Sequence, residues 1–567
     1  MKGLRPLELG AAVVVAAAAM ATARCGGDDT TTCDDASCDV SIAPLEMTLS
    51  PTEAWVRPGA AVAVTVALAR GPGGDGDVAI SIENEAGAAV TADPLTIAAA
   101  DASGTLMLHV APAFAQGDAT IVVDGAASGA SAQATFAVHV AGASGAPDTS
   151  FGNAGVVDLS PTSGVDVAAA MIALQSGVLV GGTHVEQGDA GAVSSMKVLQ
   201  LTSSGAVDGT FAATSAPGEL WSLARMYDGR VYAAGVLRGT KADFAAVRVL
   251  AAGGLDPTYA VDTPITLGDD VARAAIVEPG GALVLAGPVG DASAVGVARY
   301  TQAPLPPSDA SADADADGDT DADADTDTDA DTDAASASDS ASDSASDSAI
   351  DHVTSRLDPT FGDGGVVVTA LAKPNAGATS MLVAPDGSLY VLGYQEDSST
   401  DVAWLHYDTT GSLTKTATVP LTTGTYGAAA ALLDPDGSIV VASDDSGQSL
   451  AVRFLATGDL DATFGAGGLA ALAVGASSGA RAVARDPASG DLLLGGFTGS
   501  PHQCYVARLT PVGALDATFA NAGVLALAQG DACDVAAVAI DDDGKILVLE
   551  TVASGAETHM AVARYWP

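Results

Sequence analysis

Short apolar stretches separated by turn residues run along the chain from about residue 43 to residue 142. Within each stretch, hydrophobic residues alternate with polar ones or follow one another, and Gly, Pro, Asn and Asp separate the stretches. Alternation with a period of two is typical of strands that bury one face. The stretches run from Val62 to Ala69, Val78 to Glu83, Thr105 to Val110, Ala119 to Val123 and Ala134 to Val140. Short strands at this spacing predict a β-sandwich over residues 43–142.

A different pattern begins at residue 148, after a linker over residues 143–147, and it repeats to the C-terminus. Each unit opens on Asp, any residue, Ser or Thr, and Phe or Tyr, as in Asp148-Thr149-Ser150-Phe151. Units start near residues 148, 208, 256, 358, 414, 461 and 516. The fifth unit is degenerate, with Thr414-Lys415-Thr416-Ala417 in place of the motif. Self-similarity of this kind indicates a repeat architecture.

Two further columns recur in these units. The first is a tight turn between apolar runs, the signal of a β-hairpin, and it reads Ser176-Gly177, Asp228-Gly229, Gly280-Gly281, Asp386-Gly387, Asp436-Gly437, Ser489-Gly490 and Asp543-Gly544. The second closes each unit and reads Gln200, Arg248, Arg299, His406, Arg453, Arg508 and Arg564. A strand around the aromatic residue, two hairpin strands and a closing strand give about four strands per unit. The prediction is an all-β fold with a seven-bladed β-propeller over residues 148–567, whose ring closure needs no capping repeats.

The repeats resemble a known family. Phe361-Gly362-Asp363-Gly364-Gly365-Val366, Val383-Ala384-Pro385-Asp386-Gly387 and Val452-Arg453-Phe454 look like the delta-60 repeat, over about residues 148–300 and 357–567. The resemblance implies a propeller in a large exported bacterial protein, with no generally assigned catalytic residues. Residues 43–142 resemble a bacterial immunoglobulin-like module in architecture alone, because they lack a Cys-Trp-Cys signature. Such modules commonly act as spacers or adhesive units.

The N-terminus has the pattern of an export signal. A positively charged start precedes an apolar run too short to span a bilayer, and Ala21-Thr22-Ala23 is a cleavage-site sequence. We predict a signal peptide over residues 1–23 and a disordered tether over residues 24–42. Cys25 resembles the lipid-bearing residue of a bacterial lipoprotein, although Arg24 stands where a lipobox has a small residue. Ordinary cleavage and lipidation at Cys25 both stay open, and both imply export to the outer membrane, cell surface or medium.

Residues 301–356 interrupt the repeats with a segment that cannot bury a core. Between Ser308 and Asp351, 16 of the 44 residues are Asp and none is basic. We predict a disordered insertion between the third and fourth units. A calcium-loop opening is formed by Asp313, Asp315, Asp317 and Asp321, but the twelfth position holds Ala324 instead of Glu. A solvated linker is the favoured interpretation, and weak calcium association is compatible with it.

The chain is strongly acidic, with 22 basic and 70 acidic side chains and a net charge of −48. Nucleic acid and anionic lipid repel such a chain, so neither is an expected partner. The expected partner is an unknown protein or envelope component, and the membrane is reached only through a lipid on Cys25. Aromatic residues make up 4% of the chain, which argues against a sugar-binding surface.

Four cysteines remain besides Cys25, and an exported protein can oxidise them. Cys33 and Cys38 are close enough in sequence to close a small loop. Cys504 and Cys533 lie in the sixth and seventh units, and we predict a disulfide between them. Two separate thiols are the alternative, which geometry decides. The spacing of Cys and His suggests no zinc site.

The Arg column and the Asp of the repeat motif share one period along the chain. An anion-binding ring is one interpretation of the Arg column. The favoured interpretation is structural: the Arg side chains pair between blades with the motif aspartates, which are Asp148, Asp208, Asp256, Asp358, Asp461 and Asp516.

A further column lies ten or eleven residues before each turn glycine, at the entrance to the first hairpin strand. Four units carry acids there, namely Asp166, Glu219, Asp270 and Asp534, whereas the others carry Gly377, Gly427 and Ala480. The acidic units are consecutive in a closed ring, so their carboxylates could hold calcium or dock a basic partner. The favoured interpretation is that these acids cap turns and face water. No cofactor or metal other than calcium is expected.

Catalysis finds little support in the sequence. No G-x-S-x-G elbow, P-loop or H-E-x-x-H motif occurs, and the seven histidines do not recur in one column. We predict an exported, surface-associated binding or adhesion scaffold. The alternatives are a lyase- or lactonase-like enzyme that uses the central funnel and a purely structural envelope protein. Two histidines or metal-spaced carboxylates in the funnel would favour the enzyme, and an apolar plug would favour the scaffold.

Overall fold

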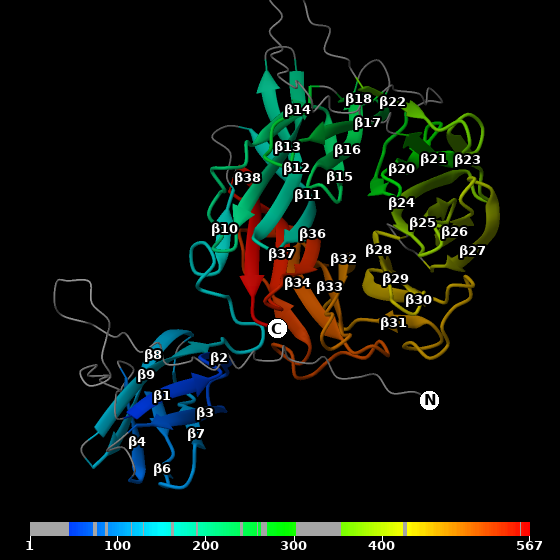
Figure 1. Cartoon of the computed structure of the whole chain (residues 1–567). Helices are drawn as coiled ribbons and strands as arrows, with labels where there is room; N and C mark the ends of the chain where they lie inside the picture. The colour runs from blue at the N-terminus through cyan, green and yellow to red at the C-terminus, as the bar shows by residue number, and fades with distance from the viewer. Residues whose placement is uncertain are drawn as a thin grey trace, which may run out of the picture. The chain divides into compact units, whose positions relative to one another are not determined.

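The computed structural model describes residues 45–567 except for 72–75, 85–88, 115, 129, 160–163, 189–190, 239–241, 258, 262–268, 302–352, 423–427 and 556. Every named element in this part of the chain is a strand. No helix there has the length and apolar character needed to cross a membrane. The chain divides between Ala143 and Ser144 into two compact units (Figure 1).

The first unit consists of two sheets. One has the order β1-β3-β7-β5, with β1 (Leu45–Ser50), β3 (Ala61–Arg70), β7 (Ser103–Val110) and β5 (Val90–Ala92). The other has the order β2-β9-β8-β4-β6, with β2 (Glu53–Val56), β9 (Ala130–Val140), β8 (Gly117–Ala127), β4 (Val78–Asn84) and β6 (Leu95–Ile97). Neighbouring strands are antiparallel except for β2 and β9. All five stretches predicted as strands in this region are strands, within β3, β4, β7, β8 and β9.

Alternation explains the core of this unit. Along β1 buried and exposed residues alternate strictly, so one face of its sheet is apolar. Val64 and Leu106 of the first sheet and Val123 and Phe136 of the second are fully buried in one shared cluster. The two sheets therefore cover each other's apolar face.

The second unit contains seven sheets in its described residues, and they follow one another around a ring in chain order (Figure 1). The first strands of successive sheets contact one another in pairs, and β36 contacts β11, which closes the ring. The first three sheets comprise β11 (Val165–Leu174), β12 (Gly177–Gly188), β13 (Gly191–Thr202) and β14 (Thr214–Pro217); β15 (Glu219–Arg225), β16 (Val231–Arg238) and β17 (Ala242–Val249); and β19 (Ala274–Val277), β20 (Leu283–Val289), β21 (Ala294–Thr301) and β23 (Val366–Thr369). The third sheet is extended by β22 (Val353–Leu357), which pairs with β21, and by β18 (Tyr259–Val261), which pairs with β22.

The remaining four sheets have four strands each. They comprise β24 (Asn375–Val383), β25 (Leu389–Glu396), β26 (Thr400–Tyr407) and β27 (Leu413–Pro420); β28 (Ala430–Leu433), β29 (Ile439–Asp445), β30 (Gln448–Phe454) and β31 (Leu469–Ala471); β32 (Gly479–Arg485), β33 (Leu492–Thr498), β34 (Gln503–Leu509) and β35 (Val524–Ala526); and β36 (Ala532–Ile540), β37 (Ile546–Ser554), β38 (Glu557–Tyr565) and β10 (Val156–Asp158). The seventh sheet thus takes its fourth strand from the start of the repeat region.

Sequence repeats and sheets are offset by one strand. In six units the strand at or after the motif position is the fourth strand of the preceding sheet, as β23 shows when it pairs with β21. The exception is the third unit, where Tyr259 begins β18, which pairs with β22 of the third sheet. Because β10 pairs with β38, the same offset joins the two ends of the repeat region. The motif aromatic packs between two sheets, and Phe361 lies in a cluster with Val297 of the third sheet and Val391 of the fourth.

Candidate functional site

A cavity lies on the axis of the ring. Its volume is about 500 Å³, and its lining comes from six of the seven sheets: Ala169, Trp221, Arg273, Thr379, Tyr394, Glu396, Thr400, Ala428, Ala429 and Arg481. Six sheets that contribute to one cavity give it a rigid wall, because each first strand is fixed on both sides by its neighbours.

A β-bulge on the first strand of each sheet supplies most of this lining. In five sheets the register shifts around one residue, which is Ala169, Trp221, Thr379, Arg481 or Ala536. Arg273 and Ala429 hold the equivalent places, because the N–H of Arg273 donates to Ala286 and that of Ala429 to Ala442 across the hairpin. A bulged residue leaves the ladder and re-aims its side chain. Six of these seven side chains therefore face the axis.

Two arginines dominate the chemistry of the cavity. The guanidinium carbon of Arg273 lies 5.1 Å from the ring centroid of Trp221. The Nε of Arg273 is buried and has no hydrogen-bond partner among the described residues. Arg481 enters from the sixth sheet, with its guanidinium carbon 4.8 Å from the ring centroid of Phe497. Glu396 is the single carboxylate of the described lining. The lining therefore carries two positive charges and one negative charge in a chain of net charge −48.

The Arg column lies away from the axis, in the outer part of each sheet. In four units the Nε of the column arginine donates to the motif aspartate at 2.7–2.8 Å: Arg248 to Asp256, Arg299 to Asp358, Arg508 to Asp516 and Arg564 to Asp148. Every motif aspartate except Asp256, whose Thr258 lies outside the described residues, also accepts hydrogen bonds from the residue two positions on, as Asp358 does from the N–H and hydroxyl of Thr360. The Arg column is therefore committed to structural pairs.

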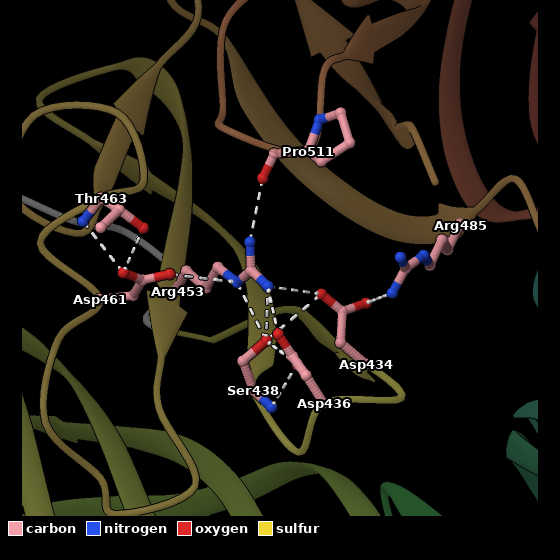
Figure 2. Close-up of polar contacts among 8 residues, drawn as sticks. All are labelled: Asp434, Asp436, Ser438, Arg453, Asp461, Thr463, Arg485 and Pro511. Carbon is pink, nitrogen blue, oxygen red and sulfur yellow. Dashed lines mark hydrogen bonds and ion pairs between the residues drawn. The ribbon is translucent and has the colours of Figure 1, made fainter. Parts of the chain in front are cut away.

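Arg453 shows how these pairs connect neighbouring sheets (Figure 2). Its Nε lies 3.5 Å from Asp461, and its Nη2 lies 3.2 Å from Asp434 and 3.1 Å from Asp436 in its own sheet's hairpin turn. Its Nη1 donates to the carbonyl of Pro511, in the next sheet, at 2.9 Å. The prediction placed the charge pairs between blades. The structure corrects this, because the carboxylates belong to the arginine's own sheet and its connection to the next sheet is a backbone carbonyl.

A family comparison matches this part of the chain. The model of a domain of unknown function described as a β-propeller (DUF5122) matches residues 435–464, which run from the Asp436-Gly437 turn through Arg453 to Phe464. The match and the closed ring of sheets agree. The second unit has a β-propeller fold. No curated protein matches the chain.

Several solved structures resemble the chain at low identity. A quinoprotein alcohol dehydrogenase-like protein from Bacteroides thetaiotaomicron is 8% identical, with 84% of this chain and 96% of that chain covered and a TM-score of 0.35. A polysaccharide lyase described as an ulvan lyase is 8% identical over 79% and 90% of the two chains, with a TM-score of 0.28. Prolyl oligopeptidase B from Galerina marginata is 10% identical over 76% and 54%, with a TM-score of 0.33. At these scores none of them bears on the activity of this propeller.

The predicted acidic column lies where the first strands begin, and the structure gives each acid a local partner. The interpretation that these acids face water is wrong for Asp166 and Asp270, because both side chains are buried. Asp166 is buried and lies 2.6 Å from His184 and 3.2 Å from Lys197. Glu219 pairs with Arg238, Asp270 accepts a hydrogen bond from the N–H of Gly290, and Asp534 lies 3.0 Å from His502. No described group of three or more possible metal ligands contains any of these acids. Calcium binding by this column stays a prediction.

The other positions of that column are small, as expected. Gly377 lies on β24 and Ala480 on β32, and both are fully buried or nearly so. Gly427 lies outside the described residues, as do Cys25, Cys33, Cys38 and the calcium-loop candidates Asp313, Asp315, Asp317 and Asp321.

The structure forms the predicted disulfide between Cys504 and Cys533, with a Cα–Cα distance of 5.5 Å. The carboxyl of Glu550 lies against it: one ligand atom from each of the three residues falls within 4.8 Å of the others. Glu550 is fully buried, and neither carboxyl oxygen has a hydrogen-bond partner among the described residues. Burial raises the pKa of Glu550 to about 8.

The axial cavity was missed by the sequence reasoning, although a signal for it exists. Its column lies eight residues before the turn glycine in every unit except the sixth, where the distance is nine. It reads Ala169, Trp221, Arg273, Thr379, Ala429, Arg481 and Ala536. Bulky and charged residues stand in a column that is otherwise small, one to three positions after the column that contains Asp166, Glu219, Asp270 and Asp534.

Proposed function

We propose that this protein is an exported binding scaffold that holds its ligand in the axial cavity of a seven-bladed propeller. The seven sheets of the described ring support the blade number, one sheet to a blade. The first unit, with its two facing sheets, supports the proposal of an immunoglobulin-like spacer. Neither of these assignments specifies a ligand.

The cavity is the observation that carries the proposal. At about 500 Å³ it has the volume of a site for a small molecule. It joins alanine walls to a few polar groups, which are the two arginines, Tyr394, Glu396 and the hydroxyls of two threonines. An apolar wall with a small number of placed polar groups is typical of ligand sites.

Export is supported by the chain's N-terminal pattern and by its cysteines. The signal-peptide pattern of residues 1–23 and Cys25 favour an outer-membrane, cell-surface or extracellular location. A disulfide in the propeller is typical of proteins from oxidising compartments. The partner we propose is therefore met outside the cytoplasm, as a ligand or a component of the envelope.

An enzyme that uses the same cavity is the alternative. The described lining lacks the pair of histidines or carboxylates that would favour an enzyme. It also lacks the plug of apolar side chains that would favour a scaffold. General acid–base chemistry in this cavity would therefore depend on Tyr394 and Glu396. The proposal of a binding scaffold is the simpler use of these groups.

Filling the cavity tests the proposal. In Ala429→Trp an indole occupies the axis, and Val167→Trp adds the same side chain at an exposed position of β11 as a control. We expect that compounds which raise the melting temperature of the full chain, in a screen of small neutral, cationic and anionic molecules, also do so in the control. They lose this effect in Ala429→Trp. Equal stabilisation of both variants would contradict binding in the cavity.

A further inference from the structure

We infer that the axial cavity takes a small ring-shaped carboxylate and that Arg273 is its anchor. This inference rests on the proposed function, because it names the ligand class of the same cavity. The shared chemistry is one carboxylate on a six-membered ring, which an acidic sugar and an aromatic acid both offer.

Arg273 differs from the column arginines because it has no anionic partner. No carboxylate of the described residues lies within ion-pair distance of its guanidinium, and its Nε is buried without an acceptor. The arginines of the Arg column have a carboxylate that accepts their hydrogen bonds. Arg248, for instance, is buried and donates to Asp256 at 2.8 Å. A buried N–H donor without an acceptor costs free energy of folding. A ligand carboxylate would satisfy the guanidinium with paired, charge-assisted hydrogen bonds.

Electrostatics also select an anion at this point. The chain repels anions over most of its surface, since it carries 70 acidic side chains against 22 basic ones. Two guanidiniums, on the third and sixth sheets, face a cavity whose described lining holds one carboxylate, that of Glu396. The cavity is therefore a local exception to the sign of the whole molecule. Its positive charge attracts an anionic ligand, which the rest of the molecule repels.

Trp221 defines the shape of the expected ligand. Its side chain lines the cavity next to Arg273 and is 42% exposed, which leaves apolar ring surface uncovered. A flat ring can cover that surface while its carboxylate meets the guanidinium beside it. Tyr394 lines the same cavity and can donate or accept a hydrogen bond at the ring's edge. Thr379 can accept one there, because its own hydroxyl donates to the carbonyl of Ala428. The alanines leave the space that the ring needs.

Two matched pairs of probes test the inference on the full chain by calorimetry at low salt. The first pair is glucuronate and glucose, and the second is benzoate and benzyl alcohol. We expect at least one acid to bind roughly tenfold or more tightly than its neutral partner, because a hydrogen-bonded charge contributes about that much. The arm that binds tells an acidic sugar from an aromatic acid. If neither acid binds better than its neutral partner, the inference is wrong.

Substitutions assign the anchor. Arg273→Gln is expected to weaken binding of the acid by roughly ten- to hundredfold, whereas Arg238→Gln, an exposed arginine paired with Glu219, leaves it unchanged. Without ligand, Arg273→Gln should melt no lower than the wild type, since it removes a buried Nε donor that has no described acceptor. Unchanged affinity in Arg273→Gln, or a large loss of stability without ligand, would show that Arg273 is a structural residue instead.

The two proposals fail in different ways. If the neutral probes bind at least as tightly as the acids and Ala429→Trp abolishes that binding, the scaffold stands and the carboxylate inference is overturned. If an acid binds equally well to Ala429→Trp, the site lies elsewhere and both proposals are overturned.

Discussion

Glu550 occupies a position where four of the other units require glycine. At Gly235, Gly287, Gly393 and Gly496 a Cβ would lie 1.7–2.0 Å from a carbonyl oxygen of the bulged first strand. The seventh unit instead places a fully buried carboxyl there, beside the Cys504–Cys533 disulfide. The two cysteines and this glutamate are thus three departures from the repeat that meet at one point. At this point a disulfide and a buried carboxyl stand in place of the close contact between glycine and backbone that the four other units have.

The titration of Glu550 makes the stability of the protein depend on pH. Its pKa is about 8 in the folded protein and near 4.5 in an unfolded chain, so the folded state binds this proton more tightly. The resulting stabilisation is fully present below about pH 4.5 and is lost as the pH rises through 8, at up to about 1.4 kcal/mol per pH unit. Urea unfolding between pH 5 and pH 8 should therefore show a steeper loss in wild type than in Glu550→Gln. Glu557→Gln, at an exposed position of β38, should follow the wild type. Identical slopes in all three proteins would contradict the assignment.

The disulfide should contribute measurably to stability. It spans 29 residues, and a loop of that length is worth roughly 2–4 kcal/mol. We expect a reducing agent to lower the urea midpoint of the wild type and to leave Cys504→Ser with Cys533→Ser unaffected. Cys33→Ser with Cys38→Ser is the control, and reduction should still destabilise it. If it does not, the effect belongs to the N-terminal cysteines.

For single residues, prediction succeeded where a position that recurs along the repeats has the same role in most units. The Arg column and the motif aspartates predict one another as partners, as in Arg299 and Asp358, and the fixed turn glycines predict positive φ, as at Gly437 with φ of 84°. The axial column was harder, because a β-bulge shifts which residue of an Ala-rich strand faces the axis. Period-two reasoning assigns faces only while the register is regular.

At the scale of elements, the first three strands of each sheet follow from the turn and Arg columns. The sheet to which the fourth strand belongs cannot be predicted from them. Nothing in one unit indicates whether this strand pairs with the sheet before it or the sheet after it in the chain. The offset is decided by ring closure: β10 pairs with β38 and the N–H of Asp148 donates to the carbonyl of Arg564. The fifth unit also connects to the next sheet through a backbone carbonyl, as Arg453 does through Pro511, but with other residues. Where the motif is missing, Lys415 donates to the carbonyl of Thr457 in the next sheet.

The ion pair at the closure should matter more than its internal equivalents. Asp148 is 1% exposed and accepts hydrogen bonds from Arg564 and Lys545 at 2.8 Å each. Burial alone would raise the pKa of Asp148, but Lys545, Ser150 and Arg564 lower it below its usual value. Arg564→Met should cost about 3 kcal/mol, because it leaves a buried carboxylate with one cation. Arg508→Met, at the more exposed Asp516 pair, should cost less in urea unfolding. Equal losses would mean that closure adds nothing to the pair.

At the scale of the whole molecule, a large part of the negative charge lies in a segment outside the repeats. The 16 aspartates between Ser308 and Asp351 supply a third of the net charge of −48, which leaves −32 for the rest. The composition of this segment predicted an interruption of the repeats over residues 301–356, because it lacks the apolar residues of a core. The structure corrects these bounds, since Thr301 belongs to β21 and Val353–Leu357 form β22. Thr301 pairs with Arg356 and Tyr300 with Leu357, so residues 302–352 connect two neighbouring strands of the third sheet.

This geometry predicts that the segment can be removed without loss of the propeller. We expect a chain with residues 302–352 replaced by a short Gly-Ser turn to unfold at an equal or slightly higher urea concentration. Shortening a flexible loop saves roughly 0.6 kcal/mol for each halving of its length.

Calcium binding to the same deletion variant separates the two predicted calcium sites in one experiment. If the Asp-rich segment holds the ion, equilibrium dialysis will show weak calcium binding in the wild type and none in the deletion. If binding persists in the deletion and is lost in Asp166→Asn with Asp270→Asn, the acidic column at the strand entrances is the site, because those carboxylates remain when the segment is gone.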